Sequence, residues 1–307
     1  MRTKAAAIGC AFGSVAFVGF FVLNVHGQQQ DFSKVEIKAT KLTNNFSKLD
    51  GQGGTIGVLT GPDGVFMVDT QFAPLSDKII AAVKQVSSNA PIRFVVNTHV
   101  HGDHTGGNEN LAKTGAVLLS RTELRYRLAH PAPGANGAPG TAAPAAALPM
   151  ITYDGPVTFH MDGEDVQLIP IPHAHTDGDT LVVFPNNDII MTGDFYRSIQ
   201  YPNIDRANGG SLRGMLDGIA LVIGLAGPKT KIVPGHGDVV DRTSLMAHRD
   251  MMLAVRDKIA PLVTQGKTLQ EVIAAKPTAE FDAKVPNASM TSERFITQVY
   301  QDLKEGK

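Results

Sequence analysis

A dense run of metal-ligand side chains lies at residues 99–104, which read His99-Val100-His101-Gly102-Asp103-His104. The run follows the apolar segment 92–96, which predicts a short buried strand, and it precedes a Thr-Gly-Gly sequence where a helix can begin. Imidazole nitrogens and carboxylate oxygens are the ligands that zinc and similar divalent ions prefer. In an extended start, His99 and His101 point the same way, whereas the following turn directs Asp103 and His104 elsewhere. The run therefore predicts a metal site at a strand end, with ligands to spare for a second ion.

Three more ligand-type residues, His175, Asp194 and His236, each stand a few residues after a predicted strand. Each alone has an ordinary explanation, because a single histidine after a strand is usually a hydrogen-bonded loop residue. Together they repeat one arrangement, in which a strand end is followed by small residues and one ligand-type side chain. Loops at one edge of a sandwich converge on a single cleft. We therefore expect these three side chains to approach the run at 99–104.

Strand and helix patterns alternate along the rest of the chain. Alternating or continuous apolar runs around tight turns predict β-hairpins, and apolar residues at helical spacing predict helices. The expected strands and hairpins lie at 35–40, 55–69, 157–171, 181–192 and 231–233, and the expected helices lie at 74–86, at 212–225 and from 242 onward. Hairpins mixed with helices predict a layered α/β sandwich with mixed sheets.

The order of these motifs resembles the metallo-β-lactamase superfamily. The His-x-His-x-Asp-His run is followed by His-Thr-x-Gly at His175, by Gly-Asp at Asp194 and by Pro-Gly-His at His236, and the likeness extends over roughly residues 35–238. It implies an α/β fold, a four-layer αβ/βα sandwich with C-terminal helices and a metal cleft at one edge. It also implies a metallo-β-lactamase-like domain at 28–241 and a helical extension packed on it at 242–307.

The resemblance also assigns roles to individual side chains. It implies a dinuclear centre of two divalent ions, with zinc expected and manganese or iron also accepted by such ligands. Asp103 is both a ligand and the expected catalytic proton acceptor. The implied ligands are His99, His101 and His175 for the first ion, Asp103, His104 and His236 for the second, and Asp194 as the bridge between them.

Two further residues are predicted to bind substrate. Arg197, three residues after Asp194, could hold an anionic group, or it could form a surface salt bridge. His173 lies where the family often has a small residue or proline, so it is either a wall of the pocket or an ordinary polar loop residue.

The implied activity is that of an exported metallo-hydrolase, in which a hydroxide shared by the two ions attacks a carbonyl. The substrate would be a small-molecule ester, lactone, thioester or β-lactam. The cysteine-containing zinc β-lactamases carry a cysteine near the position of Asp194, so the aspartate makes the chain more similar to glyoxalase II and the lactonases. Two alternatives remain: a mononuclear non-haem iron oxidoreductase of the persulfide-dioxygenase type, and a non-catalytic binding member.

An export signal is predicted at residues 1–27. Arg2 and Lys4 precede an apolar segment at 5–25, and small residues then lead to Gly27. We expect a periplasmic or secreted protein without a stable membrane partner, or a membrane-anchored one if the segment is not cleaved. The single cysteine, Cys10, lies within this segment, and a net charge of −1 argues against a nucleic-acid partner.

Two other segments allow alternatives. Residues 130–149 are nearly all Ala, Pro and Gly, which predicts a mobile surface loop that is either a neutral insertion or a flap over a pocket. Met246, Met251, Met252, Leu253 and Val255 lie near helical spacing. They would cover the core or form the face of a homo-oligomer.

Overall fold

The computed structural model describes residues 31–133 and 137–306. Residues from Phe32 onward form one compact unit. The predicted export signal at 1–27, with Cys10, lies outside the described residues. Among the helices of the described part, none is both long enough and apolar enough to span a membrane.

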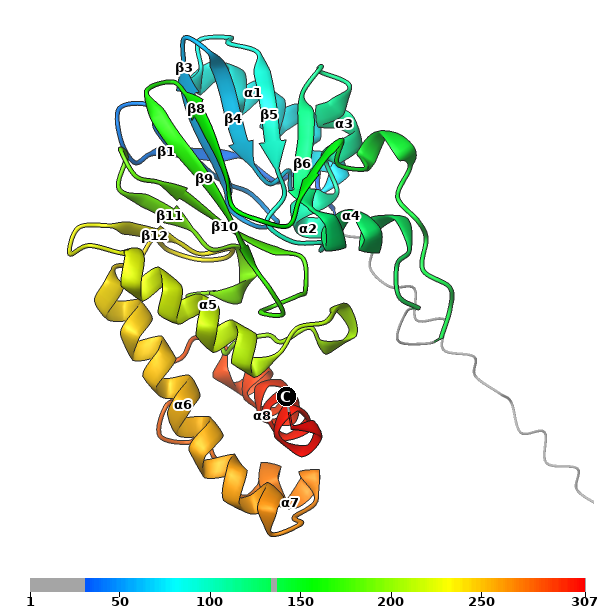
Figure 1. Cartoon of the computed structure of the whole chain (residues 1–307), viewed down its shortest axis with the longest axis vertical. Helices are drawn as coiled ribbons and strands as arrows, with labels where there is room; N and C mark the ends of the chain where they lie inside the picture. Colours follow the sequence, from blue (N-terminus) through cyan, green and yellow to red (C-terminus); the bar gives the residue numbers. More distant parts are fainter. Residues whose placement is uncertain (1–30, 134–136, 307) are drawn as a thin grey trace, which may run out of the picture. The chain divides into compact units, whose positions relative to one another are not determined.

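Seven strands form the first sheet, which begins as an antiparallel meander and ends with parallel neighbours (Figure 1). The hairpin expected at 55–69 is confirmed, and its turn ends at Gly64, whose positive φ of 115° suits glycine. In sheet order the strands are β1 (Lys38–Lys41), β2 (Phe46–Asp50), β3 (Ile56–Gly61), β4 (Gly64–Val68), β5 (Ile92–Val96), β6 (Val117–Arg121) and β7 (Ile151–Tyr153).

Five strands form the second sheet, in the order β12-β11-β10-β9-β8. Both hairpins expected here are confirmed, since β8 pairs with β9 and β10 pairs with β11 in antiparallel fashion. β11 then pairs in parallel with β12. The strands are β8 (Val157–Met161), β9 (Glu164–Ile171), β10 (Asp179–Phe184), β11 (Ile189–Met191) and β12 (Lys231–Val233).

The two sheets pack face to face around a shared apolar core. Phe46 of the first sheet meets Phe184 of the second with ring centroids 4.6 Å apart. The outer face of the first sheet packs on α1, and the outer face of the second packs on the C-terminal helices. This order of helices, sheet, sheet and helices confirms the predicted four-layer sandwich.

Helices complete the two outer layers and the connections. α1 (Ser76–Val86) confirms the helix expected at 74–86, after a 3₁₀ turn, and α5 (Leu212–Leu225) confirms the helix expected at 212–225. The others are η1 (Ala73–Leu75), α2 (Gly102–Thr105), α3 (Asn108–Ala112), α4 (Thr122–Ala129), η2 (Ala145–Ala147), η3 (Gly193–Phe195), η4 (Arg206–Asn208), α6 (Arg242–Thr264), α7 (Leu269–Ala274) and α8 (Ala288–Glu305).

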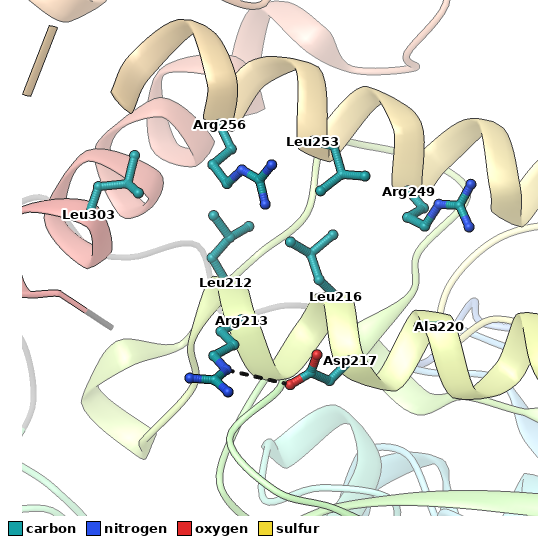
Figure 2. Close-up of a pocket in the computed structure, with 9 residues that line it drawn as sticks. All are labelled: Leu212, Arg213, Leu216, Asp217, Ala220, Arg249, Leu253, Arg256 and Leu303. Carbon is teal, nitrogen blue, oxygen red and sulfur yellow. Dashed lines mark ion pairs between the residues drawn. The ribbon is translucent and has the colours of Figure 1, made fainter. Parts of the chain in front are cut away.

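The methionine-rich face of α6 packs inward. Met251 and Met252 are buried in the apolar cluster that α5, α6 and α8 share with the second sheet. The face therefore covers the core, as one of the two alternatives expected. A homo-oligomer stays a prediction, and so does the domain boundary between residues 241 and 242. Residues of α5, α6 and α8 line a groove of about 450 Å³, in which Leu216 and Leu253 lie between the exposed Arg213 and the half-buried Arg249 (Figure 2).

Candidate metal centre

All seven predicted ligands lie in loops or short helices at one edge of the sandwich. The turn after β5 carries His99 and His101, and α2 begins directly after His101. His175 lies between β9 and β10, Asp194 lies in η3 after β11, and His236 follows β12. The structure thus brings these side chains together because the strands that precede them end at the same edge.

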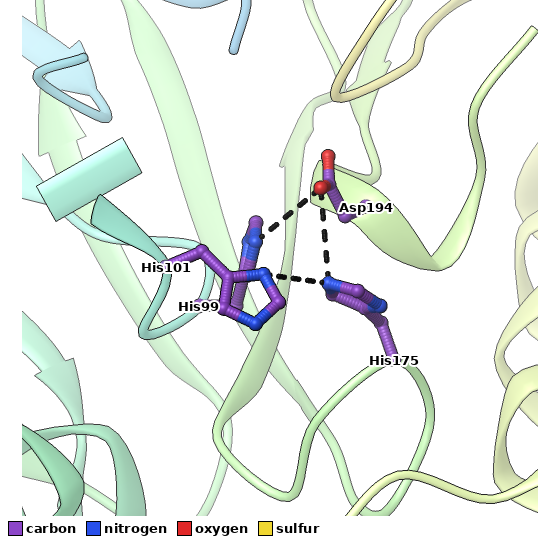
Figure 3. A group of neighbouring side chains, drawn as sticks. All are labelled: His99, His101, His175 and Asp194. Atoms are coloured by element: carbon purple, nitrogen blue, oxygen red, sulfur yellow. Dashed lines mark hydrogen bonds and ion pairs between the residues drawn. The ribbon is translucent and has the colours of Figure 1, made fainter. Parts of the chain in front are cut away.

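The first group consists of His99, His101, His175 and Asp194, whose potential ligand atoms lie within 4.8 Å of one another. Figure 3 shows the three rings and the carboxylate pointing toward a common centre. Nε2 of His175 lies 3.0 Å from Nδ1 of His101. Oδ2 of Asp194 lies 3.5 Å from Nε2 of His99 and 3.7 Å from Nε2 of His175.

The second group consists of Asp103, His104 and His236. Nε2 of His236 lies 3.1 Å from Oδ2 of Asp103 and 3.4 Å from Nε2 of His104. The other oxygen of Asp194, Oδ1, lies 3.3 Å from Nε2 of His104 and 3.5 Å from Nε2 of His236. Asp194 therefore faces the first group with one oxygen and the second group with the other.

Oxygen atoms hold the outward-facing nitrogen of three histidine rings. Nε2 of His101 lies 2.6 Å from Oδ2 of Asp205, and Nδ1 of His175 lies 2.6 Å from the Asn203 carbonyl. Nδ1 of His104 lies 2.7 Å from Oδ2 of Asp69. Because carboxylates and carbonyls only accept here, each of these nitrogens carries the hydrogen, and the lone pair of the other nitrogen faces the centre.

Asp69 connects the two groups from behind. It is buried at the end of β4, and it accepts hydrogen bonds from the backbone N–H and the hydroxyl of Thr98, both at 2.7 Å. The Thr98 hydroxyl lies 3.0 Å from Nδ1 of His99 and can accept from it. Asp69 thereby orients His104 directly and His99 through Thr98.

This donor set fits divalent metal ions. Nε2 of His99 and Oδ1 of Asp194 are buried, and neither has a hydrogen-bond partner among the described residues. Two lone pairs, on His175 and His101, face each other at 3.0 Å, which is stable only with a cation between them. Burial lowers the pKa values of His99 and His175 well below the ordinary value, so protons are poor candidates for that cation.

Asp103 is held in its charged form. Although burial acts to raise the pKa of Asp103, the hydrogen bond to His236 and the neighbouring imidazoles hold it well below the usual range. Its side chain is still 24% exposed, unlike the fully buried carboxylate of Asp194. Asp103 therefore combines a ligand position with access to solvent.

Glycines leave room for the ligands at two points. A Cβ at Gly54 would overlap the ring of His104, and a Cβ at Gly235 would overlap Oδ1 of Asp194. The backbone at these glycines also joins the two sheets, because the N–H of Thr55 donates to the Gly235 carbonyl at 2.7 Å. Any larger residue at either position would displace a ligand.

Arg197 and His173 take different places. The guanidinium of Arg197 forms an ion pair with Asp194, and burial lowers its pKa to about 10, so it stays charged at neutral pH. The salt bridge envisaged for it is therefore buried rather than on the surface, and contact with substrate stays a prediction. His173 lies outside both groups, with Nδ1 3.1 Å from the Gly209 carbonyl.

Sequence reasoning assigned no role to Asp69 or Asp205. Asp69 ends a predicted hairpin, which is a weak signal of a functional position. Asp205 stands in an irregular segment, 104 residues from the His101 it contacts, and no motif marks it. Only the folded chain brings this carboxylate to the histidine.

Comparisons with known proteins agree with this architecture. A family model described as the metallo-beta-lactamase superfamily matches residues 49–242. A linear primary-alkylsulfatase from Pseudomonas sp. is 22% identical over 257 residues, which cover 70% of this chain and 48% of the relative. The chain thus spans about half the length of that curated relative.

Solved structures share the fold. A metallo-beta-lactamase from Pontibacter korlensis has a TM-score of 0.58 at 19% identity, covering 71% of this chain and 99% of that one. The sec-alkylsulfatase Pisa1 from Pseudomonas sp. has a TM-score of 0.65 at 18% identity, covering 86% of this chain and 50% of that one. The family model spans more than half of the chain and includes all seven residues of the two groups, so the chain belongs to the metallo-β-lactamase superfamily.

Proposed function

We propose that this protein is a metal-dependent hydrolase with a dinuclear centre. One observation carries the proposal: seven donor side chains form two adjacent groups, and Asp194 faces one group with each of its oxygens. His99, His101 and His175 would hold the first ion, and Asp103, His104 and His236 would hold the second. A bridging carboxylate is what a two-ion site requires and a one-ion site does not.

Two divalent ions bound there would lower the pKa of water toward neutrality and polarise the oxygen of an electrophile. The protein's own residues supply position and proton transfer. Asp69, Asp205 and the Asn203 carbonyl orient three rings, so the lone pairs are aimed before any ion arrives. Asp103, ionised and reachable from solvent, can accept a proton at a carboxylate oxygen.

The substrate is proposed to be a small ester, lactone, thioester or β-lactam. Sulfate esters join this set because the sec-alkylsulfatase named above shares the fold and the primary-alkylsulfatase shows sequence similarity. The substrate would enter at the sheet edge where Asp103 and His101 are partly exposed, since His99, His175 and Asp194 are buried.

Elemental analysis of protein purified without added metal tests the centre directly. We expect about two zinc or manganese ions per chain in the wild type, about one in Asp194→Ala, and about two in the control Asp217→Ala, which changes an exposed residue of α5. Hydrolysis of the ester, lactone, thioester, β-lactam and sulfate-ester panel should fall more than 100-fold in Asp194→Ala only. One iron per chain would instead support the mononuclear oxidoreductase, and no metal after reconstitution would refute the ligand assignment.

We also propose that residues 1–27 direct export of the enzyme. Sequencing the N-terminus of the mature protein should find a start near Gln28 in a periplasmic or secreted fraction. An intact N-terminus in the membrane fraction would support the anchored alternative.

A further inference from the structure

We propose that a pocket beside His101 receives an uncharged, apolar part of the substrate; this rests on the proposed hydrolase function. The pocket has a volume of about 390 Å³. Most of its wall is apolar, and the side chains that form this apolar part are those of Val100, Leu128, Pro131, Ala132, Pro133, Ala143 and Ala207.

The pocket adjoins the metal centre at one ligand, His101. His101 belongs to the first group of ligands and also lines the pocket, as do its neighbours Val100 and Gly102. The His101 side chain is 26% exposed, whereas His99 and His175 are buried. His101 is thus the one partly exposed ligand of the first group, and the proposal places the substituent of a bound substrate beyond this ring, in the pocket.

The charged residues of the pocket already have polar partners, and Arg127 is neutralised by one of them. Arg127 makes two contacts with Asp177, from Nε to Oδ1 at 2.9 Å and from Nη2 to Oδ2 at 2.5 Å. Asp205 contacts His101, and it accepts from Nδ2 of Asn208 at 2.6 Å. Among the described lining residues, the cation Arg127 is therefore not free to bind an anionic group, and the partners of Asp205 leave its negative charge in place. Burial of an anionic substituent would therefore be unfavourable, and burial of an alkyl group favourable.

Part of the wall comes from residues 131–133 and from Thr141 and Ala143, which belong to the Ala/Pro/Gly-rich segment. The N–H of Ala143 donates to the Leu128 carbonyl at 2.9 Å, which ties the returning arm of the segment to the end of α4. Pro131 and Pro133 restrict the backbone of the outgoing arm. The small side chains of Ala132 and Ala143 leave the volume open. The described residues of this segment thus shape the specificity of the site.

A chain-length series tests the pocket. With metal-loaded enzyme and p-nitrophenyl acetate, butyrate, hexanoate and octanoate, kcat/KM should rise by up to about fourfold per buried methylene. Ala143→Phe fills the pocket and should lower kcat/KM for the octanoate more than tenfold, with the acetate within twofold. Ala142→Phe is the matched control, since Ala142 does not line the pocket, and it should behave as wild type. A terminal carboxylate on the octanoate chain should lower kcat/KM more than tenfold relative to the unmodified octanoate ester.

A binding measurement separates failure of the pocket from failure of the proposed function. The neutral fluorophore N-phenyl-1-naphthylamine should bind the metal-loaded wild type and Ala142→Phe with the same affinity. It should bind Ala143→Phe and Ala132→Phe about tenfold more weakly. Equal binding to all four proteins, or ester rates independent of chain length, would overturn the pocket assignment. Selective loss of probe binding in a protein that holds two ions but hydrolyses nothing would support the pocket and refute the hydrolase.

Discussion

Replacing Asp205 with Asn changes one atom in the contact that orients His101. Oδ2 of Asp205 lies 2.6 Å from Nε2 of His101, and Oδ1 accepts from the backbone N–H of Asn208 at 3.1 Å. An asparagine has the same shape and can keep the bond to Asn208 through its oxygen. Its NH₂ group would then face the donors of His101 and of the Asn208 side chain, and turned the other way it would face the backbone N–H of Asn208. In either orientation two donors meet and His101 loses its charged acceptor.

The contact sets the size of the expected effect. A hydrogen bond to a charged group contributes about 1.5–3 kcal/mol. The side chains of His101 and Asp205 are 26% and 18% exposed, so solvent weakens the contact toward the lower part of that range. A loss of about 1.5–2 kcal/mol corresponds to roughly 10- to 30-fold weaker binding of the first ion. Binding of the second ion should change by less than about threefold, because its ligand His104 is oriented by Asp69 rather than by Asp205.

Competition with a chromophoric chelator measures both zinc affinities after the protein has been stripped with EDTA. Asp165→Asn is the control, because Asp165 contacts His160 at the same distance of 2.6 Å on the exposed surface. This control should bind both ions as the wild type does. The reasoning fails if Asp205→Asn binds the first ion within twofold of the wild type, or if the control weakens it equally.

Three other predictions concern stability. Removing metal with EDTA should lower Tm by several degrees, and adding zinc should restore Tm, because ions that bind only the folded chain stabilise that state. An unchanged Tm after EDTA treatment of a protein shown to hold two ions would contradict this prediction. Asp302 is buried and accepts hydrogen bonds from Nε of Arg206 and the N–H of Leu212, both at 2.6 Å. Asp302→Ala should therefore lower the free energy of unfolding, measured in urea, by about 3 kcal/mol. A decrease below about 1 kcal/mol would show that the contact is unimportant. Burial lowers the pKa of His248 to about 4, so between about pH 6.5 and pH 4 the unfolded chain binds a proton that the folded chain does not, and stability falls as pH falls. The free energy of unfolding of His248→Leu should fall about 2 kcal/mol less than that of the wild type between pH 7 and pH 5. An equal pH dependence of this free energy in the two proteins would refute the prediction.

Local pattern was enough to predict most of the elements. The continuous apolar runs and tight turns of β3–β4, β8–β9 and β10–β11 predicted three hairpins, because turn chemistry and burial act over a few residues. β2, with the sequence Phe-Ser-Lys-Leu-Asp, was not predicted, since its polar residues give only a weak strand pattern. β6 and β7 were also not predicted, and both pair in parallel across long connections that local sequence does not specify.

The ligand-type residues were visible in the chain because metal chemistry restricts them to a few side chains, and the run at 99–104 places four of them together. Their arrangement depended on the fold. Asp69 and Asp205 lie behind rings that are far from them in the sequence, and the apolar wall beside His101 likewise joins distant segments. Side-chain type is a local property, whereas the direction of a lone pair and the shape of a pocket depend on which strands end at the same edge.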